Sequence, residues 1–233
     1  MFEMLPELAV AVLASIIAIT LHEAAHGYAA LALGDPTAKI LGRVSLNPIR
    51  HVDPVGTLLV PGILLVSQLL ATGRVDVMFG WAKPVPVDIR NLTNPRTGMM
   101  LVAAAGPAMN FALAFIAALL IHPAGLLEGS LSADSMALVY RFLALSILAN
   151  LVLGLFNLFP IPPLDGGRIV TGLLPWRAAM AYARLEPAGL FIVIGVLFLL
   201  PALIPAFQPM DFFVREIVRP AFDLVIRAAG LNH

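Results

Sequence analysis

Long apolar segments dominate this chain of 233 residues and restrict the environments in which it can fold. Hydrophobic residues make up 60% of the sequence and charged residues only 12%, and the mean hydropathy is +0.95. About 20 apolar residues in a helix cross a bilayer core of roughly 30 Å. The candidate segments are residues 8–33, 55–71, 98–121, 142–159 and 188–207. We therefore predict an all-α polytopic membrane protein, a transmembrane helix bundle that forms one integral-membrane domain over residues 1–233, and exclude a water-soluble globule.

The charge balance and the absence of cysteine narrow the possible functions. The 14 Lys and Arg residues are matched by 14 Asp and Glu residues. The chain lacks the positive surplus that neutralises nucleic-acid phosphates, so no nucleic-acid partner is expected. With zero cysteines, thiolate zinc sites, iron–sulfur clusters and cysteine nucleophiles are excluded. A metal in this protein must be bound by His, Asp or Glu side chains.

The sequence His22-Glu23-Ala24-Ala25-His26 lies inside the first apolar segment. It matches H-E-x-x-H, in which two histidines on one helix face can bind one metal ion. Glu23 lies about 100° around the helix from His22, where it can hydrogen-bond a metal-bound water without binding the metal. Ionisable groups within a membrane-spanning segment mainly face a cavity, pair with one another or bind an ion. A metal site is the favoured interpretation, and simple pairing between helices is the alternative.

A catalytic zinc site usually has three protein ligands and a water, so a third ligand is expected elsewhere. The candidates are His51, Asp53, His122, Glu128 and Asp165. Asp165 is favoured because residues 160–167 contain three prolines and two glycines, which cannot continue the apolar helix before them. Irregular backbone at membrane depth is tolerated where it is buried in protein or lines a wet cavity. The alternative is an Asp-Gly turn at a helix end. For His51 and Asp53, an accessory metal role is weighed against a turn at a helix start.

Loop charges predict the orientation in the membrane. Seven Lys and Arg residues lie between the first and third apolar segments, whereas residues 122–138 contain none. The positive-inside rule places the former region in the cytoplasm. His22, His26 and Asp165 then meet on the cytoplasmic side, provided that residues 55–71 do not span but form a re-entrant segment or lie along the core. Four spans are therefore predicted, at residues 8–33, 98–121, 142–159 and 188–207.

Residues 81–89 read Trp-Ala-Lys-Pro-Val-Pro-Val-Asp-Ile, and their prolines forbid a central strand. The alternation of apolar with other residues predicts a small membrane-associated β-hairpin or edge strand. The backbone at Val85 and Val87 could then pair with an unwound substrate. The rival interpretation is a solvated cytoplasmic loop.

Asn110, Asn150 and Asn157 are the remaining polar groups that hydrocarbon would penalise. Interhelical hydrogen bonding is the usual explanation. The alternative is that Asn110, and with it Asn157, holds the substrate backbone or the developing oxyanion. Near the C-terminal end, charged residues recur every fourth position over residues 211–229. This spacing predicts an amphipathic helix in the membrane interface, kinked at Pro220.

Four stretches of the chain together resemble the site-2 proteases, a family of intramembrane zinc metalloproteases. They are the motif at His22 to His26, Phe-Gly-Trp-Ala-Lys-Pro-Val-Pro-Val at residues 79–87, Gly-Pro-Ala-Met-Asn at 106–110, and Asn-Leu-Phe-Pro-Ile-Pro-Pro-Leu-Asp-Gly at 157–166. The resemblance implies one zinc ion held by His22, His26 and Asp165, with Glu23 as catalytic base. It favours the substrate role of Asn110. It also implies membrane-tethered protein substrates and a compact prokaryotic form without a PDZ or CBS domain.

The predicted function is zinc-assisted hydrolysis of peptide bonds in membrane-tethered proteins, within or near the bilayer. The expected partners are membrane-spanning protein substrates and the lipid bilayer. The expected location is the prokaryotic cell membrane, with the active site toward the cytoplasm. Two alternatives use the same His and Asp site: a metal-ion transporter and a catalytically silent membrane-protein binder. The sequence carries no prediction of the oligomeric state.

Overall fold

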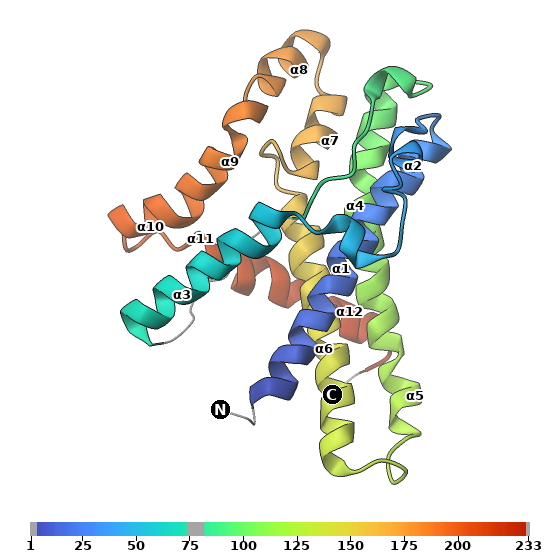
Figure 1. Ribbon diagram of the computed structural model, residues 1–233, viewed down its shortest axis with the longest axis vertical. Coiled ribbons are helices and arrows are strands. Elements are labelled where there is room, and N and C mark those ends of the chain that lie inside the picture. Colours follow the sequence, from blue (N-terminus) through green and yellow to red (C-terminus); the bar gives the residue numbers. More distant parts are fainter. Residues whose placement is uncertain (1–3, 74–81, 232–233) are drawn as a thin grey trace.

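Three long helices form the core of the computed structural model, which describes residues 4–73 and 82–231. They are α1 (Met4–Ala32), α4 (Pro95–Leu119) and α6 (Ala133–Asn157), and each packs against the other two. Helices α1 and α6 run in the same direction, and α4 runs in the opposite one (Figure 1). The topology prediction requires α1 and α6 to run in the same direction, because only then can the chain after α6 meet the C-terminal end of α1.

Local sequence signals set the starts of two of these helices. Asn94 caps α4 by accepting a hydrogen bond from the backbone N–H of Thr97 at 3.2 Å, and Pro95 occupies the first helical position. Ser132 caps α6 in the same way, through the backbone N–H of Ser135. Both caps satisfy donors that the first helical turn would otherwise leave without partners.

Small residues fill the interfaces between the three core helices. Buried alanines line them, and Gly154 of α6 lies so close to α4 that a Cβ atom would come within 3.1 Å of Asn110 Cβ. Small residues let helices approach closely where lipid supplies no hydrophobic driving force. Many large apolar side chains lie on the outside instead, where Leu8 is 61% exposed and Ile116 is 49% exposed. Such a surface is suited to contact with lipid.

Among the described residues, four helices are long and apolar enough to cross a bilayer. They are Pro6–Ala32, Pro95–Gly125, Ala133–Asn157 and Glu186–Leu203, and they correspond to the four predicted spans. The all-α, multi-pass membrane class is therefore confirmed. The remaining apolar stretch forms η2 (Pro54–Leu59) and α3 (Val60–Thr72), which together make a shorter helix that leaves the core at an angle (Figure 1). Its re-entrant position in the membrane stays a prediction.

Shorter elements complete the fold. Between α1 and α4 lie α2 (Thr37–Ile40), η1 (Pro48–His51) and η3 (Ile89–Asn91), and α5 (Ile121–Gly125) follows α4. After α6 come α7 (Asp165–Leu173), α8 (Trp176–Ala183), α9 (Glu186–Ile194), η4 (Gly195–Leu199) and α10 (Leu200–Leu203). The predicted C-terminal helix corresponds to α11 (Pro209–Phe212), η5 (Phe213–Val218) and α12 (Arg219–Ala228). Phe213 and Val218 bury it against α4 and α6, and its place in the membrane interface stays a prediction.

The predicted β-hairpin over residues 81–89 is wrong for the part of it that the structure describes, since Trp81 lies outside the described residues. Residues 82–88, which we call the strap, form no strand, and the single β-bridge in the described chain joins Glu128 to Leu131. The physical reason is that Pro84 and Pro86 have no N–H groups. Three of the other N–H groups donate to acceptors that are not in a strand: Lys83 N–H to His51 O, Val85 N–H to Glu23 Oε2 and Asp88 N–H to Asp35 Oδ2.

Candidate metal centre and active site

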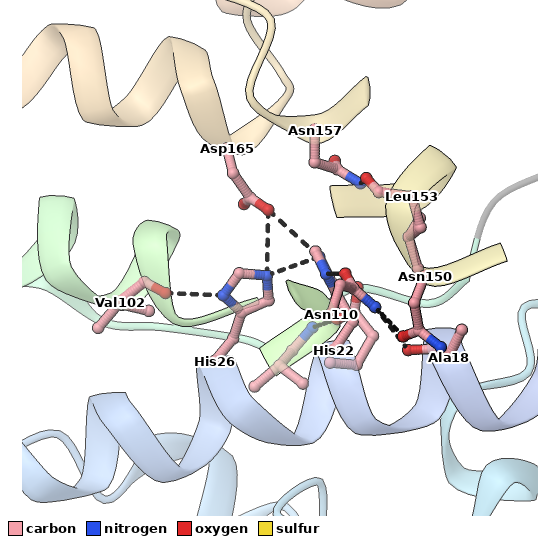
Figure 2. A network of polar contacts seen from close by, with 11 residues as sticks. Ala18, His22, His26, Val102, Asn110, Asn150, Leu153, Asn157 and Asp165 are labelled. Carbon is pink, nitrogen blue, oxygen red and sulfur yellow. Dashed lines mark hydrogen bonds and ion pairs between the residues drawn. The ribbon is translucent and has the colours of Figure 1, made fainter. Parts of the chain in front are cut away.

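Three side chains from distant parts of the chain converge at one point in the core (Figure 2). His22 and His26 lie on α1, and Asp165 is the first residue of α7. The two histidine Nε2 atoms are 3.0 Å apart, and Asp165 Oδ2 lies 3.2 Å from His22 Nε2 and 3.3 Å from His26 Nε2. All three residues are buried. In the described part of the chain, this is the one group of three or more such side chains that could hold a metal ion.

Hydrogen bonds on the far side of each imidazole determine which nitrogen faces this point. His22 Nδ1 lies 2.6 Å from Asn110 Oδ1, and His26 Nδ1 lies 2.7 Å from the carbonyl oxygen of Val102. Asn110 Oδ1 acts as an acceptor because the amide nitrogen of Asn110 donates to Asn150 Oδ1 at 2.8 Å. Each Nδ1 therefore carries the proton, and each Nε2 presents a lone pair to the centre of the cluster.

Two imidazole lone pairs and a carboxylate repel one another unless a cation lies between them. Asp165 Oδ2 is buried and has no hydrogen-bond partner among the described residues. A hydrogen bond between the two Nε2 atoms would need a doubly protonated imidazole, whereas a divalent cation satisfies all three groups at once. Ligand atoms around tetrahedral zinc, with bonds of about 2.0–2.1 Å, lie about 3.3 Å apart. The spacing of the three donor atoms fits a zinc site with a fourth position for water.

Glycines allow backbone to pass close to this cluster. At Gly106 of α4, a Cβ atom would lie 2.5 Å from His26 Nε2 and 2.6 Å from His22 Cε1. Gly166 and Gly167 lie directly against the backbone of residues 158–162. The chain after α6 therefore folds tightly back on itself and brings Asp165 to α1. The sequence analysis included Gly106 in the stretch 106–110 that resembles the site-2 proteases but gave it no role of its own. A glycine within an apolar helix was the other signal for it.

Glu23 lies beside the cluster on the wall of a cavity of about 400 Å³. His22, His26, Val85, Val87, Leu153, Phe156, Asn157 and Asp165 line the same cavity. Glu23 Oε2 accepts a hydrogen bond from the backbone N–H of Val85 at 3.0 Å. The carboxylate of Glu23 does not belong to the group formed by His22, His26 and Asp165, as helix geometry predicts. This arrangement can hold a metal-bound water next to a carboxylate base.

The predicted substrate-binding asparagines lie in different environments. Asn110 is fully buried, and besides its bonds to His22 and Asn150 it donates to the carbonyl oxygen of Ala18 at 3.4 Å. Interhelical hydrogen bonding by Asn110 is therefore present. Asn157 donates within its own helix to Leu153 O at 3.0 Å and lines the cavity. Substrate binding by either residue stays a prediction, and Asn110 would have to leave these bonds to contact a peptide.

The other candidate third ligands have partners away from the cluster. His51 Nε2 lies 2.8 Å from Ser45 O, Asp53 caps η2 through the N–H groups of Val55 and Gly56, His122 Nε2 lies 2.7 Å from Ala229 O, and Glu128 accepts from Tyr140 at 2.7 Å. Helix capping accounts for Asp53. None of the four belongs to the group of side chains that could hold a metal ion in the described residues.

We expect Gly106→Ala to lose most of its bound metal, because the added methyl group overlaps both imidazole rings. Metal content of the purified protein, measured by mass spectrometry, checks this. Gly125→Ala is the matched control, since a Cβ there meets only Tyr140 Oη at 3.7 Å. Full metal content in Gly106→Ala would contradict the close approach of α4 to the metal cluster.

Asn110→Leu removes the acceptor that holds the proton on His22 Nδ1. Loss of such an outer hydrogen bond lowers metal affinity by roughly 10–100-fold, and competition with a chelator measures the change. Asn157→Leu serves as control and should keep wild-type affinity, because its amide bonds only within α6 in the described structure. Equal affinities for the two variants would remove the orienting role of Asn110.

The chain as a whole is similar to known proteins. Residues 122–200 match the model of peptidase family M50. The chain is 40% identical to "Putative zinc metalloprotease YwhC" of Bacillus subtilis over 219 aligned residues. The aligned region covers 93% of this chain and 92% of that protein. It is 34% identical over 190 residues to "Putative zinc metalloprotease Rip2" of Mycobacterium tuberculosis, which covers 81% of this chain and 66% of that protein. No solved structure matches the chain significantly. The chain therefore belongs to peptidase family M50, the site-2 protease family, and is a zinc metalloprotease.

Proposed function

We propose that this protein is an intramembrane endopeptidase that cleaves membrane-tethered proteins within or near the bilayer. The observation that carries the proposal is the position of His22, Glu23 and His26 inside a 27-residue apolar helix, on the wall of a cavity that Asp165 also lines. A site at this depth is reached most directly by a substrate that is itself in the membrane. The apolar cavity walls at Leu153 and Phe156 suit such a substrate.

In this proposal His22, His26 and Asp165 are the zinc ligands, and Glu23 is the catalytic base. A bound zinc ion supplies Lewis acidity, which activates water and polarises the scissile carbonyl. Glu23 takes the proton from the attacking water and later delivers it to the leaving amine. Asn110 and Val102 keep both histidines in the tautomer that ligation requires.

The strap and Asn157 are the proposed contacts for the substrate backbone. A protease needs an extended peptide, and a transmembrane helix offers one only after it unwinds. Hydrogen bonds from the backbone at Val85 and Val87 would stabilise the unwound form by pairing along the strap. Asn157 lines the same cavity and could bind a peptide carbonyl. Asn110 is a further candidate to donate a hydrogen bond to the developing oxyanion. For this it would have to leave its buried hydrogen bonds.

The proposed location is the prokaryotic cell membrane, with the active site toward the cytoplasm. The supporting observation is the distribution of positive charge. Seven Lys and Arg residues lie between the first and third apolar segments, and none lies in residues 122–138. The metal cluster lies toward the end of α1 that leads into this positive region, so it would face the cytoplasmic leaflet (Figure 1).

Glu23→Gln should keep zinc and lose cleavage of a transmembrane substrate, because the amide cannot accept a proton from water. Asp165→Ala should lose both, because it removes a ligand. Zinc content and cleavage by detergent-purified protein are measured together. Glu216→Gln, an exposed glutamate on η5, is the matched control and should cleave normally. Cleavage that survives Glu23→Gln would overturn the assignment of the base.

Val87→Pro tests backbone pairing along the strap. Proline removes one N–H and should lower substrate cleavage about tenfold or more through KM, with zinc content unchanged. Val87→Ala keeps the N–H and is the control. Val87 is a cleaner position than Val85, whose N–H already bonds to Glu23. Equal cleavage by the proline and alanine variants would exclude pairing at this position.

A further inference from the structure

Arg43 is a buried cation that the proposed mechanism leaves without a role. It follows Gly42, whose φ of +64° turns the chain at the end of α2, and its exposure is only 9%. Its Nη2 atom donates to the carbonyl oxygen of Lys83 at 2.6 Å and to that of Pro84 at 3.4 Å. Its Nε atom is buried and has no hydrogen-bond partner among the described residues. The guanidinium thus holds the backbone of the strap directly before Val85.

The surroundings of Arg43 do not explain it as a stabilising group. Among the described residues no carboxylate forms an ion pair with it, and one donor is left unsatisfied. The charges that act on it are those of Glu23 and Arg50; burial lowers the pKa of Arg43, Glu23 raises it, and Arg50 lowers it further. Burial of a charge without an ion-pair partner, and of a donor without an acceptor, both cost free energy of folding. A different role accounts better for this side chain.

The strap is held at both ends, and Glu23 is bonded between them. At one end the N–H of Lys83 donates to His51 O at 2.9 Å. At the other end the N–H of Asp88 donates to Asp35 Oδ2 at 2.7 Å, and Asp35 is fully buried. Between these anchors, the N–H of Val85 donates to Glu23. Arg43 donates to the carbonyl oxygens of Lys83 and Pro84, which directly precede that N–H. The guanidinium therefore restrains the position of the Val85 N–H.

We propose that Arg43 is a positioning residue, which holds the strap in the one register that places the Val85 N–H on the Glu23 carboxylate and so orients the base. The inference rests on the proposed role of Glu23. One carboxylate oxygen of Glu23 accepts a hydrogen bond from the strap, so in this proposal the other oxygen is the one that accepts the proton from water. Without the guanidinium, the Lys83–Val85 backbone is free to shift, and a shift of about 1 Å in a catalytic group can cost on the order of a hundredfold in rate.

The kinetic test compares Arg43→Met, Arg43→Lys and Arg50→Met in cleavage of one transmembrane substrate. Arg43→Met should lower kcat by about tenfold or more, with zinc content unchanged. KM should stay within about threefold, because the Asp35 anchor keeps the Val87 end of the strap in place. Arg43→Lys should recover part of kcat, since an ammonium group can still donate to these carbonyls. Arg50 is exposed on η1, seven residues after Arg43, and its variant should match wild type.

Hydrogen exchange of the backbone provides a readout independent of activity. The strap has two prolines, so its exchangeable amides are few, and three of them donate the hydrogen bonds described above. Exchange at Lys83 and Val85 should become faster in Arg43→Met, while Asp88 and the core helices keep wild-type protection. Unchanged exchange in the strap would overturn the proposal, whatever the kinetics show.

A double-mutant cycle with Val85→Pro tests the route from Arg43 to Glu23. Proline removes the N–H that bonds to Glu23, so adding Arg43→Met should lower kcat no further. Additive losses, or a loss confined to KM, would show that Arg43 does not act through this hydrogen bond and would overturn the proposal. Glu23→Gln separates this result from failure of the proposed function: its cleavage tests whether Glu23 is the base, and the exchange measurement tests whether Arg43 holds the strap.

Discussion

Three buried electron-pair donors that repel one another meet in the core, and the surrounding contacts hold them together. The unprotonated Nε2 atoms of His22 and His26 lie 3.0 Å apart. Asp165 Oδ2 lies 3.2 Å from the first of them and 3.3 Å from the second. In a low-dielectric interior this grouping is unfavourable without a cation. Much of the surrounding structure keeps it in place. Asn110 and Val102 fix the tautomers from behind, and Gly106 lets α4 pass directly over the rings.

Helix parity and small side chains bring these groups together. Because α1 and α6 run in parallel, the chain leaving α6 reaches the end of α1 that carries both histidines (Figure 1). The Pro- and Gly-rich stretch then reverses within a few residues, since Gly166 and Gly167 have no side chains to clash with the backbone of residues 158–162. Gly154 lets α6 approach α4 in the same manner. Close helix packing therefore substitutes for the hydrophobic driving force that lipid does not supply.

The sequence predicted the parts of the site that depend on local spacing and on topology. H-E-x-x-H places His22, Glu23 and His26 on one helix, and the Pro- and Gly-rich break at residues 160–167 favoured Asp165 over the other candidates. Loop charges and helix parity then predicted that the two regions meet. The strand prediction for the strap was wrong because alternation alone does not supply a partner, and two prolines removed donors that a ladder needs. The roles of Gly106 and Arg43 depend on contacts between segments far apart in sequence. No local pattern distinguishes Arg43 from the exposed Arg50 seven residues later.

In the proposed mechanism, His22, His26 and Asp165 bind one catalytic zinc ion with an open fourth position. X-ray absorption spectroscopy at the zinc edge of the purified wild-type protein tests this most directly. We expect a four-coordinate shell of nitrogen and oxygen atoms at about 2.0–2.1 Å, with the outer scattering of two imidazole rings. A shell with fewer than two imidazoles, or a six-coordinate shell of oxygen atoms alone, would contradict it.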